Sequence, residues 1–176
     1  MLRTFNLREA TIDRLPDQLR PDLRLVFVGT AASTRSAAVG HYYAHPGNRF
    51  WQAIHEAGIT PRRYQPSEFR ELLELGIGFT DLSKSGAGMD HQIEAASIDV
   101  PGFRAKIKKY RPKTVAFTSK KAASLFYGRP SGVISLGRQQ PEENLPDVFV
   151  LASPSGAASG HWTLRPWREL AAWIAV

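Results

Sequence analysis

Asp81 is the side chain whose type and position most favour acid–base chemistry. It lies in the apolar run 77–82 (IGFTDL), which has the composition of a buried strand, so its carboxylate can face the loop after a neighbouring strand. A carboxylate placed there can stabilise a developing cation and can orient or deprotonate water, which contributes about a hundred- to ten-thousand-fold in rate. We therefore expect Asp81 to be catalytic. The alternative is that it only caps a turn before Ser83.

The loop 153–160 is a second candidate region, this time for binding a phosphate. It offers small hydroxyls and backbone N–H groups, and Gly156 lets a phosphate approach closely because it has no side chain. Ser155 could instead be a nucleophile, but it lacks the Gly-x-Ser-x-Gly elbow of α/β hydrolases. His161 can contact a phosphate when charged, although a lone His beside Trp162 more often packs or caps. The histidines show no metal-ligand spacing and Cys is absent, so we expect no metal.

The formal net charge of the 176-residue chain is +7, from 23 Lys and Arg against 16 Asp and Glu. This surplus favours a polyanionic partner. Nucleic acid fits better than a membrane, because the charges are scattered through loops and helix ends rather than along one helix face. Lys120 and Lys121 are candidate phosphate contacts. A basic protein without such a partner is the alternative.

Length and composition fit one compact globular domain over residues 1–176, of which 1–22 are less clearly patterned. No apolar run approaches the roughly 18 residues that cross a bilayer. The N-terminus, with Arg3, Arg8 and Glu9 close together, lacks the apolar block of a signal peptide. We expect a soluble, monomeric, cytoplasmic protein.

A sheet must position these side chains, because short apolar runs alternate with helical patterns along the chain. Strands are predicted over residues 24–29, 77–82, 114–118 and 148–152. Helices are predicted from Pro46 to about Gly58, over 66–75 and 101–110, from Ser119 to Phe126, and from Thr163 onward. The connection 129–146 can hold a short extra strand. This alternation predicts a three-layer α/β/α fold with a central, mainly parallel four-stranded sheet.

In such sheets, ligands bind beyond the carboxyl ends of the strands, where the strand order reverses. The loops that qualify are residues 30–46, 83–89, 119–121 and 153–160. The first strand leads into residues 29–33 (GTAAS), without the Gly-x-Gly-x-x-Gly turn of a redox dinucleotide enzyme. We therefore expect no cofactor.

Three ordered segments resemble one known family. The most diagnostic is 43–51 (YAHPGNRFW), and it is accompanied by 78–82 (GFTDL) and 153–158 (SPSGAA). Over residues 23–173 the chain resembles the mismatch-specific uracil and thymine-DNA glycosylase branch of the uracil-DNA glycosylase superfamily. The resemblance implies that family's fold. It also implies a monofunctional base-excision hydrolase that removes uracil, and other deaminated bases, from single- or double-stranded DNA and leaves an abasic site.

The first motif of that branch is atypical here. Relatives carry a GINPG-like sequence whose Asn positions or activates water, whereas Ala31 stands at the Asn position in this chain. A methyl group cannot accept or donate a proton, so another residue must act. Hydrolysis of an N-glycosidic bond passes through an oxocarbenium-like sugar, which the Asp81 carboxylate can stabilise. The alternative is a non-catalytic damaged-DNA or nucleotide binding protein of the same fold.

The resemblance also implies a base pocket. Tyr43 stands where the family places an aromatic ring that stacks on the extruded base, an interaction worth about 1–3 kcal/mol. Main-chain groups near Thr30 and Tyr43 would read the base edge. Ala31 and Ser153 complete the expected base-binding set. Main-chain readout predicts broad specificity, because no dedicated side-chain amide rejects other deaminated bases. Tyr43 could instead be a core or rim aromatic.

The DNA contacts are expected from the last loop and one Lys: Ser155, Gly156, Ala157, Ala158, Ser159, His161 and Lys120. In relatives a bulky residue of this loop wedges into the base stack, whereas Ala157 and Ala158 are small. A small plug recovers little of the few kcal/mol spent on unstacking, so single-stranded or weakly paired substrates are expected to be favoured.

Two further expectations concern neighbours of the pocket. Asn48 and Arg49 are expected to anchor the active-site loop by hydrogen bonds to its carbonyls. A lyase step needs an amine placed to form a Schiff base, and no Lys is clearly placed for it, Lys84 being the nearest in sequence to Asp81.

Overall fold

The computed structural model describes residues 15–88, 93 and 95–175. Arg3, Arg8, Glu9, Met89 and His91 lie outside them. The elements, in chain order, are β1 (Leu25–Gly29), α1 (Thr34–Val39), α2 (Phe50–Glu56), η1 (Pro66–Leu75), β2 (Ile77–Asp81), η3 (Ala95–Ser97), α3 (Val100–Tyr110), β3 (Thr114–Phe117), α4 (Lys120–Tyr127), η4 (Ser131–Val133), β4 (Gly137–Arg138), β5 (Asp147–Val150), η5 (Gly156–His161) and α5 (Arg165–Ile174), where η marks a 3-10 helix. None of the helices among these residues is both long and apolar enough to cross a membrane.

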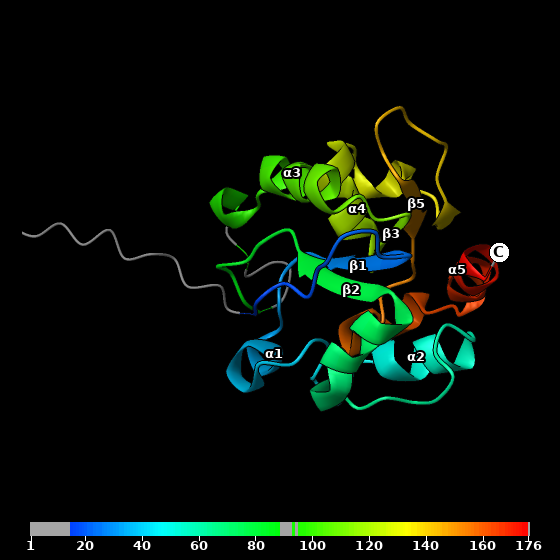
Figure 1. Cartoon of the computed structure of the whole chain (residues 1–176). Helices are drawn as coiled ribbons and strands as arrows, with labels where there is room; N and C mark the ends of the chain where they lie inside the picture. The colour runs from blue at the N-terminus through cyan, green and yellow to red at the C-terminus, as the bar shows by residue number, and fades with distance from the viewer. Residues whose placement is uncertain (1–14, 89–92, 94, 176) are drawn as a thin grey trace, which may run out of the picture.

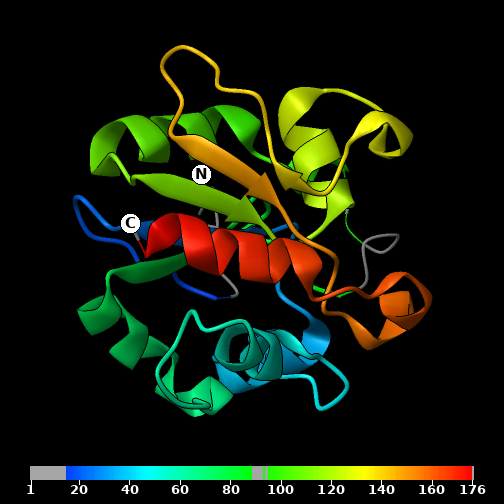
Figure 2. The same ribbon diagram turned by 90° about the vertical axis from the view of Figure 1, so that its right-hand side faces the viewer.

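The sheet has the strand order β2-β1-β3-β5-β4 and is parallel except for β4, which runs antiparallel to β5. Helices α3 and α4 cover one face, while α1, α2, η1 and α5 lie on the other (Figures 1 and 2). This arrangement confirms the predicted three-layer α/β/α class. The sheet has five strands rather than four. The added strand, β4, lies in the connection 129–146 and is too short, at two residues, to produce an alternating pattern.

The parallel strands are apolar throughout because both of their faces are buried. In β1, Leu25 and Phe27 pack into the core cluster under α2, η1 and α5, whereas Val26 and Val28 pack into the cluster under α3 and α4. Successive side chains of a strand point to opposite faces, so a strand covered on both sides reads as a continuous apolar run. Because these strands run parallel, their carboxyl ends lie at one edge of the sheet.

The predicted helix start at Pro46 is wrong, and α2 begins at Phe50. The Asn48 side-chain Oδ1 accepts a hydrogen bond from the Phe50 N–H at 2.9 Å, so the residues after Pro46 form a turn instead of a first helical turn. Short helices also lie in the first and the last of the four loops predicted to follow strands. They are α1, capped by the Ser33 hydroxyl, and η5, which follows Ser155.

Candidate active site

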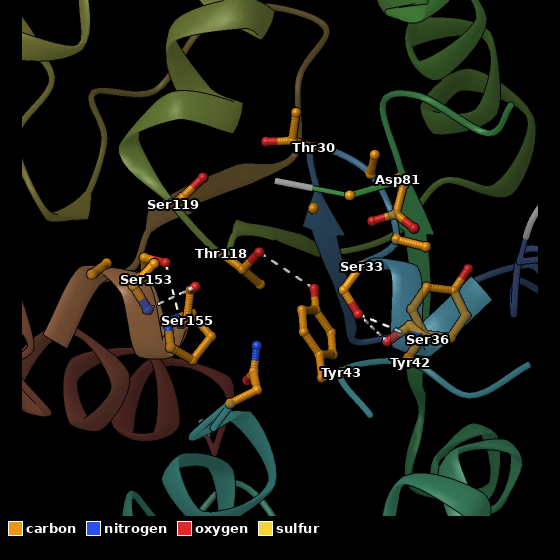
Figure 3. Close-up of a pocket in the computed structure, with 18 of the residues that line it drawn as sticks. Thr30, Ser33, Ser36, Tyr42, Tyr43, Asp81, Thr118, Ser119, Ser153 and Ser155 are labelled. Atoms are coloured by element: carbon orange, nitrogen blue, oxygen red, sulfur yellow. Dashed lines mark hydrogen bonds between the residues drawn. The ribbon is translucent and has the colours of Figure 1, made fainter. Parts of the chain in front are cut away.

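A cavity of about 290 Å³ opens at the carboxyl ends of the parallel strands. It lies where the strand order reverses between β1 and β3, which is the usual ligand position in such sheets. Each of the four predicted loops reaches it, through Thr30, Gly88, Ser119 and Ser153 respectively. Figure 3 shows Tyr43 between Asp81 on one side and Ser153 and Ser155 on the other.

Asp81 is the last residue of β2 and pairs with Gly29 of β1. Its side chain lines the cavity yet is only 5% exposed. Burial raises the pKa of this carboxyl from 3.8 to about 6, and the nearby Lys84 charge opposes the rise. The group is therefore mostly ionised at neutral pH but can still take up a proton, as a general base must.

A network of charged side chains stands behind the Asp81 carboxylate. Lys84 Nζ lies 4.0 Å from Asp81 Oδ2 and 2.9 Å from Asp17 Oδ1. Lys106 Nζ lies 2.6 Å from the second oxygen of Asp17. These contacts hold the pKa of Asp17 below its ordinary value, although burial of the group acts in the opposite direction. Sequence reasoning missed Asp17, because its residue type carries no signal without the contacts of the folded chain.

Tyr43 has one ring face filled by protein. The ring stacks on Phe50, with centroids 4.0 Å apart and planes 15° apart. Its hydroxyl donates a hydrogen bond to Thr118 Oγ1 at 3.3 Å, and Thr118 donates in turn to the Val28 carbonyl at 3.4 Å. Burial, followed by the Asp81 charge, raises the pKa of Tyr43, so the phenol stays protonated. Since Tyr43 also lines the cavity, it can present a rigid apolar surface to a ligand.

The turn that presents Tyr43 is fixed by hydrogen bonds on both sides. The Ala44 N–H donates to Ser36 Oγ at 2.9 Å, and the Trp51 indole N–H donates to the Tyr42 carbonyl at 3.1 Å. Tyr43 itself has a φ of 51°, in the left-handed region that non-glycine residues seldom adopt. This strained conformation at the cavity wall is typical of residues placed for function. Sequence reasoning missed Ser36, whose spacing from Ser33 would have indicated only a helix cap.

The segments 43–51 and 153–158 touch each other directly. The Arg49 backbone N–H donates to the Pro154 carbonyl at 2.8 Å. A Cβ on Gly156 would lie 3.1 Å from the Gly47 carbonyl oxygen, so the two backbones pack closely there. The Arg49 guanidinium lies 5.4 Å from the centre of the Trp162 ring. Arg49 thus reaches the loop through its main chain, whereas Asn48 bonds within its own turn.

The predicted site residues separate into two groups. Those that line the cavity are Thr30, Ala31, Tyr43, Asp81, Ser153, Ser155, Ala157 and Ala158. Those outside its lining are Gly156, Ser159, His161 and Lys120, all of them exposed. The second group lies beside lining residues, because Lys120 follows Ser119 and the others belong to η5. The first group can surround a small planar group, and the second can contact the polymer to which that planar group is attached.

Comparisons with known proteins concern the family and the fold of the chain. A family model described as the uracil DNA glycosylase superfamily matches residues 16–176. The solution NMR structure of a candidate uracil DNA glycosylase from Methanosarcina acetivorans is 24% identical in sequence, with a TM-score of 0.57. The match covers 92% of this chain and 93% of that chain, and at this identity it shows a shared fold.

Proposed function

Because the chain belongs to the uracil DNA glycosylase superfamily, we propose that it is a monofunctional DNA base-excision glycosylase. It flips uracil, and other deaminated bases, out of DNA and hydrolyses the N-glycosidic bond. The products are the free base and an abasic site. Residues 43–51 support placement in the mismatch-specific branch, with the atypical first motif at Ala31.

The observation that carries this proposal is the Asp81 carboxylate, buried at the cavity edge beside Gly29. As the C1′–N bond breaks, the base leaves with the bonding electron pair and the sugar becomes an oxocarbenium-like cation. Asp81 stabilises that cation and takes a proton from the water whose oxygen bonds to C1′. The departing base is protonated by solvent. Ala31, at the position of the missing Asn, can contribute its main chain only.

The base is held by stacking and by main-chain groups. Phe50 occupies one face of the Tyr43 ring, so the extruded base meets the other side of that rigid pair. Thr30, Ala31 and Ser153 line the same cavity, and in this proposal their backbone groups bind the edge of the base. Backbone donors and acceptors suit several deaminated bases, which supports broad specificity.

The phosphates flanking the extruded base are bound by the exposed rim. Ser155 caps η5, and Gly156, its first residue, is exposed and has no side chain to keep a phosphate away. Lys120 adds a positive charge at the start of α4. Ala157 and Ala158 are too small to fill the gap left in a duplex. Single-stranded or weakly paired substrates are therefore preferred.

A panel of oligonucleotides tests the proposal. Each carries one altered base (uracil, hypoxanthine, xanthine or a mismatched thymine), in single- and double-stranded form. After incubation with the protein, alkali reveals abasic sites by strand cleavage. Strand breaks that appear only after alkali indicate a hydrolase without lyase activity. Retarded electrophoretic migration without base release from any oligonucleotide would instead support the non-catalytic binding protein that Ala31 makes conceivable.

A further inference from the structure

Lys84 approaches Asp81 from outside the cavity. Its Nζ lies 4.0 Å from Asp81 Oδ2, whereas Asp81 Oδ1 lies beside Gly29. Gly29 and Asp81 both line the cavity and Lys84 does not. The Lys84 side chain is 14% exposed, so solvent screens its charge only weakly. The two oxygens of Asp81 thus have different surroundings: Oδ1 lies on the cavity side, where a ligand would bind, and Oδ2 faces the Lys84 ammonium group.

The position of Lys84 is fixed by partners from distant parts of the chain. Lys84 Nζ forms an ion pair with Asp17 Oδ1 at 2.9 Å, and Lys84 also donates a hydrogen bond to the Tyr42 hydroxyl at 3.3 Å. Asp17 is held in turn by Lys106 Nζ at 2.6 Å and by the Thr80 hydroxyl at 2.6 Å. If the Lys84 side chain turned into solvent, it would lose its contacts with both Asp17 and the Tyr42 hydroxyl.

The cluster is electrically neutral only when Asp81 is ionised. Lys84 and Lys106 contribute two positive charges, and Asp17 and Asp81 contribute two negative ones. Among the residues that the structure describes, the other titratable group beside Asp81 is Tyr43, which is neutral. Without Lys84, the buried Asp81 carboxylate would lose its nearest opposite charge. Because an unpaired buried charge is costly in free energy, the carboxylate would then take up a proton more readily.

We infer that Lys84 is a positioning residue for Asp81. The Lys84 ammonium group, held in place by Asp17, keeps the Asp81 carboxylate ionised and leaves Asp81 Oδ1 turned toward the ligand. In direction, the Lys84 charge lowers the pKa of Asp81 against the effect of burial. The inference rests on the proposed function for its kinetic consequence only, since the ionisation of Asp81 is measurable without any substrate.

A carboxyl titration by NMR tests it. Protein labelled with ¹³C at the Asp carboxyl carbons is titrated, and the Asp81 signal is identified by its loss in Asp81→Asn. In Lys84→Met the apparent pKa of Asp81 is expected to rise by about one pH unit or more, the usual effect of an opposite charge at this distance. Lys108→Met is the matched control, because Lys108 is an exposed Lys of α3 that makes no contact with the cluster and should leave the titration unchanged.

A second variant keeps the test decisive if Lys84→Met does not fold. The chain has no Cys, so Lys84→Cys introduces one thiol that can be alkylated selectively with bromoethylamine in the unfolded protein before refolding. The alkylated side chain restores an ammonium group of nearly the same length. The pKa of Asp81 should be high with the thiol and return toward the wild-type value after aminoethylation. An Asp81 titration that is the same with and without the ammonium group would overturn the inference.

Kinetics separates this inference from the proposed function. If the protein is a glycosylase, the pH at which the excision rate levels off moves upward with the Asp81 titration in the variants that lack the ammonium group. If wild type releases no base from any oligonucleotide, the proposed function fails while the NMR result still decides the role of Lys84. If base release is normal and neither the titration nor the pH profile moves, the inference alone fails.

Discussion

The Asp81 carboxylate occupies the space that a side chain at position 29 would need. A Cβ built on Gly29 would lie 2.5 Å from Asp81 Oδ1 and 3.4 Å from the Tyr43 hydroxyl. The first distance is closer than real Cβ contacts allow, so packing against the carboxylate requires glycine here. The Asp81 side chain packs directly against the backbone of Gly29 on the neighbouring strand, beside the cavity.

Replacement of Gly29 by Ala should displace the Asp81 carboxylate while leaving the sheet intact. We expect Gly29→Ala to lower the single-turnover excision rate by about a hundredfold, because a catalytic group moved by about 1 Å loses that much. Circular dichroism and DNA affinity should stay near wild type. Gly132→Ala is the control, since a Cβ there meets no atom within 4 Å. Equal rates for Gly29→Ala and Gly132→Ala would mean that this packing has no part in catalysis.

The burial of Asp81 should make the fold less stable above about pH 6 than in acid. Its pKa is raised from 3.8 to about 6, so the native state binds more protons than the unfolded state between these values. Its contribution to the free energy of unfolding is therefore complete below about pH 4 and is lost as the pH rises through about 6, a difference of about 3 kcal/mol. Asp81→Asn should be more stable than wild type near pH 8, and this advantage should vanish near pH 4.

Urea unfolding at the two pH values measures this effect. Asp22→Asn is the control, because its side chain is 66% exposed and solvent screens it. A stability difference between Asp81→Asn and wild type that is the same at both pH values would show that Asp81 ionises normally in the folded protein.

Tyr43 should act through its ring more than through its hydroxyl. Tyr43→Phe keeps the stack on Phe50 and loses only the bond to Thr118, so we expect excision within a few-fold of wild type. Tyr43→Ala removes the stacking surface, worth about 1–3 kcal/mol, and should weaken binding of a uracil oligonucleotide by roughly 5- to 150-fold. Affinities measured in the Asp81→Asn background, where turnover is suppressed, provide the comparison. A folded Tyr43→Ala that binds as tightly as Tyr43→Phe would place the base elsewhere.

The sequence predicts this site only as far as local patterns reach. The buried strands are evident because both faces are covered, as Phe27 and Val28 illustrate, and their carboxyl ends locate Asp81 and Ser153. The connection 129–146 does hold the short extra strand that the sequence allowed, β4, but its two residues gave no pattern that could locate it. Helix α1 is missed because its six residues produce no clear period. The support of the site depends on contacts between distant positions, such as Tyr43 with Thr118, 75 positions apart.

The same limit explains why Lys84 could not be assigned a role from the sequence. Its proximity to Asp81 along the chain is visible there, but the residue that holds it, Asp17, comes from the segment that covers the edge of β2, where Gln18 bridges to Phe79. That segment shows no apolar period of its own. Its function as a support emerges only from the packed structure.

Lys120 should contribute to DNA affinity through charge alone. It is exposed at the start of α4, next to the cavity-lining Ser119. Lys120→Gln should weaken binding equally for all base sequences and reduce the slope of log K against log salt by about one, the effect of losing one phosphate contact. Lys113 precedes β3, at the end of that strand remote from the cavity, so Lys113→Gln should leave the slope unchanged. Identical slopes for the two variants would remove Lys120 from the DNA interface.

The most direct test of the account is the excision rate of Asp81→Asn. Wild type and variant are mixed in excess with a single-stranded oligonucleotide that carries one uracil, and base release is followed over a single turnover while the affinity for the same oligonucleotide is measured. The account predicts a fall in rate of at least about a hundredfold with the affinity and the fold retained. Near-normal excision by the folded variant would contradict it, because the only carboxylate among the described residues that line the cavity would then be dispensable.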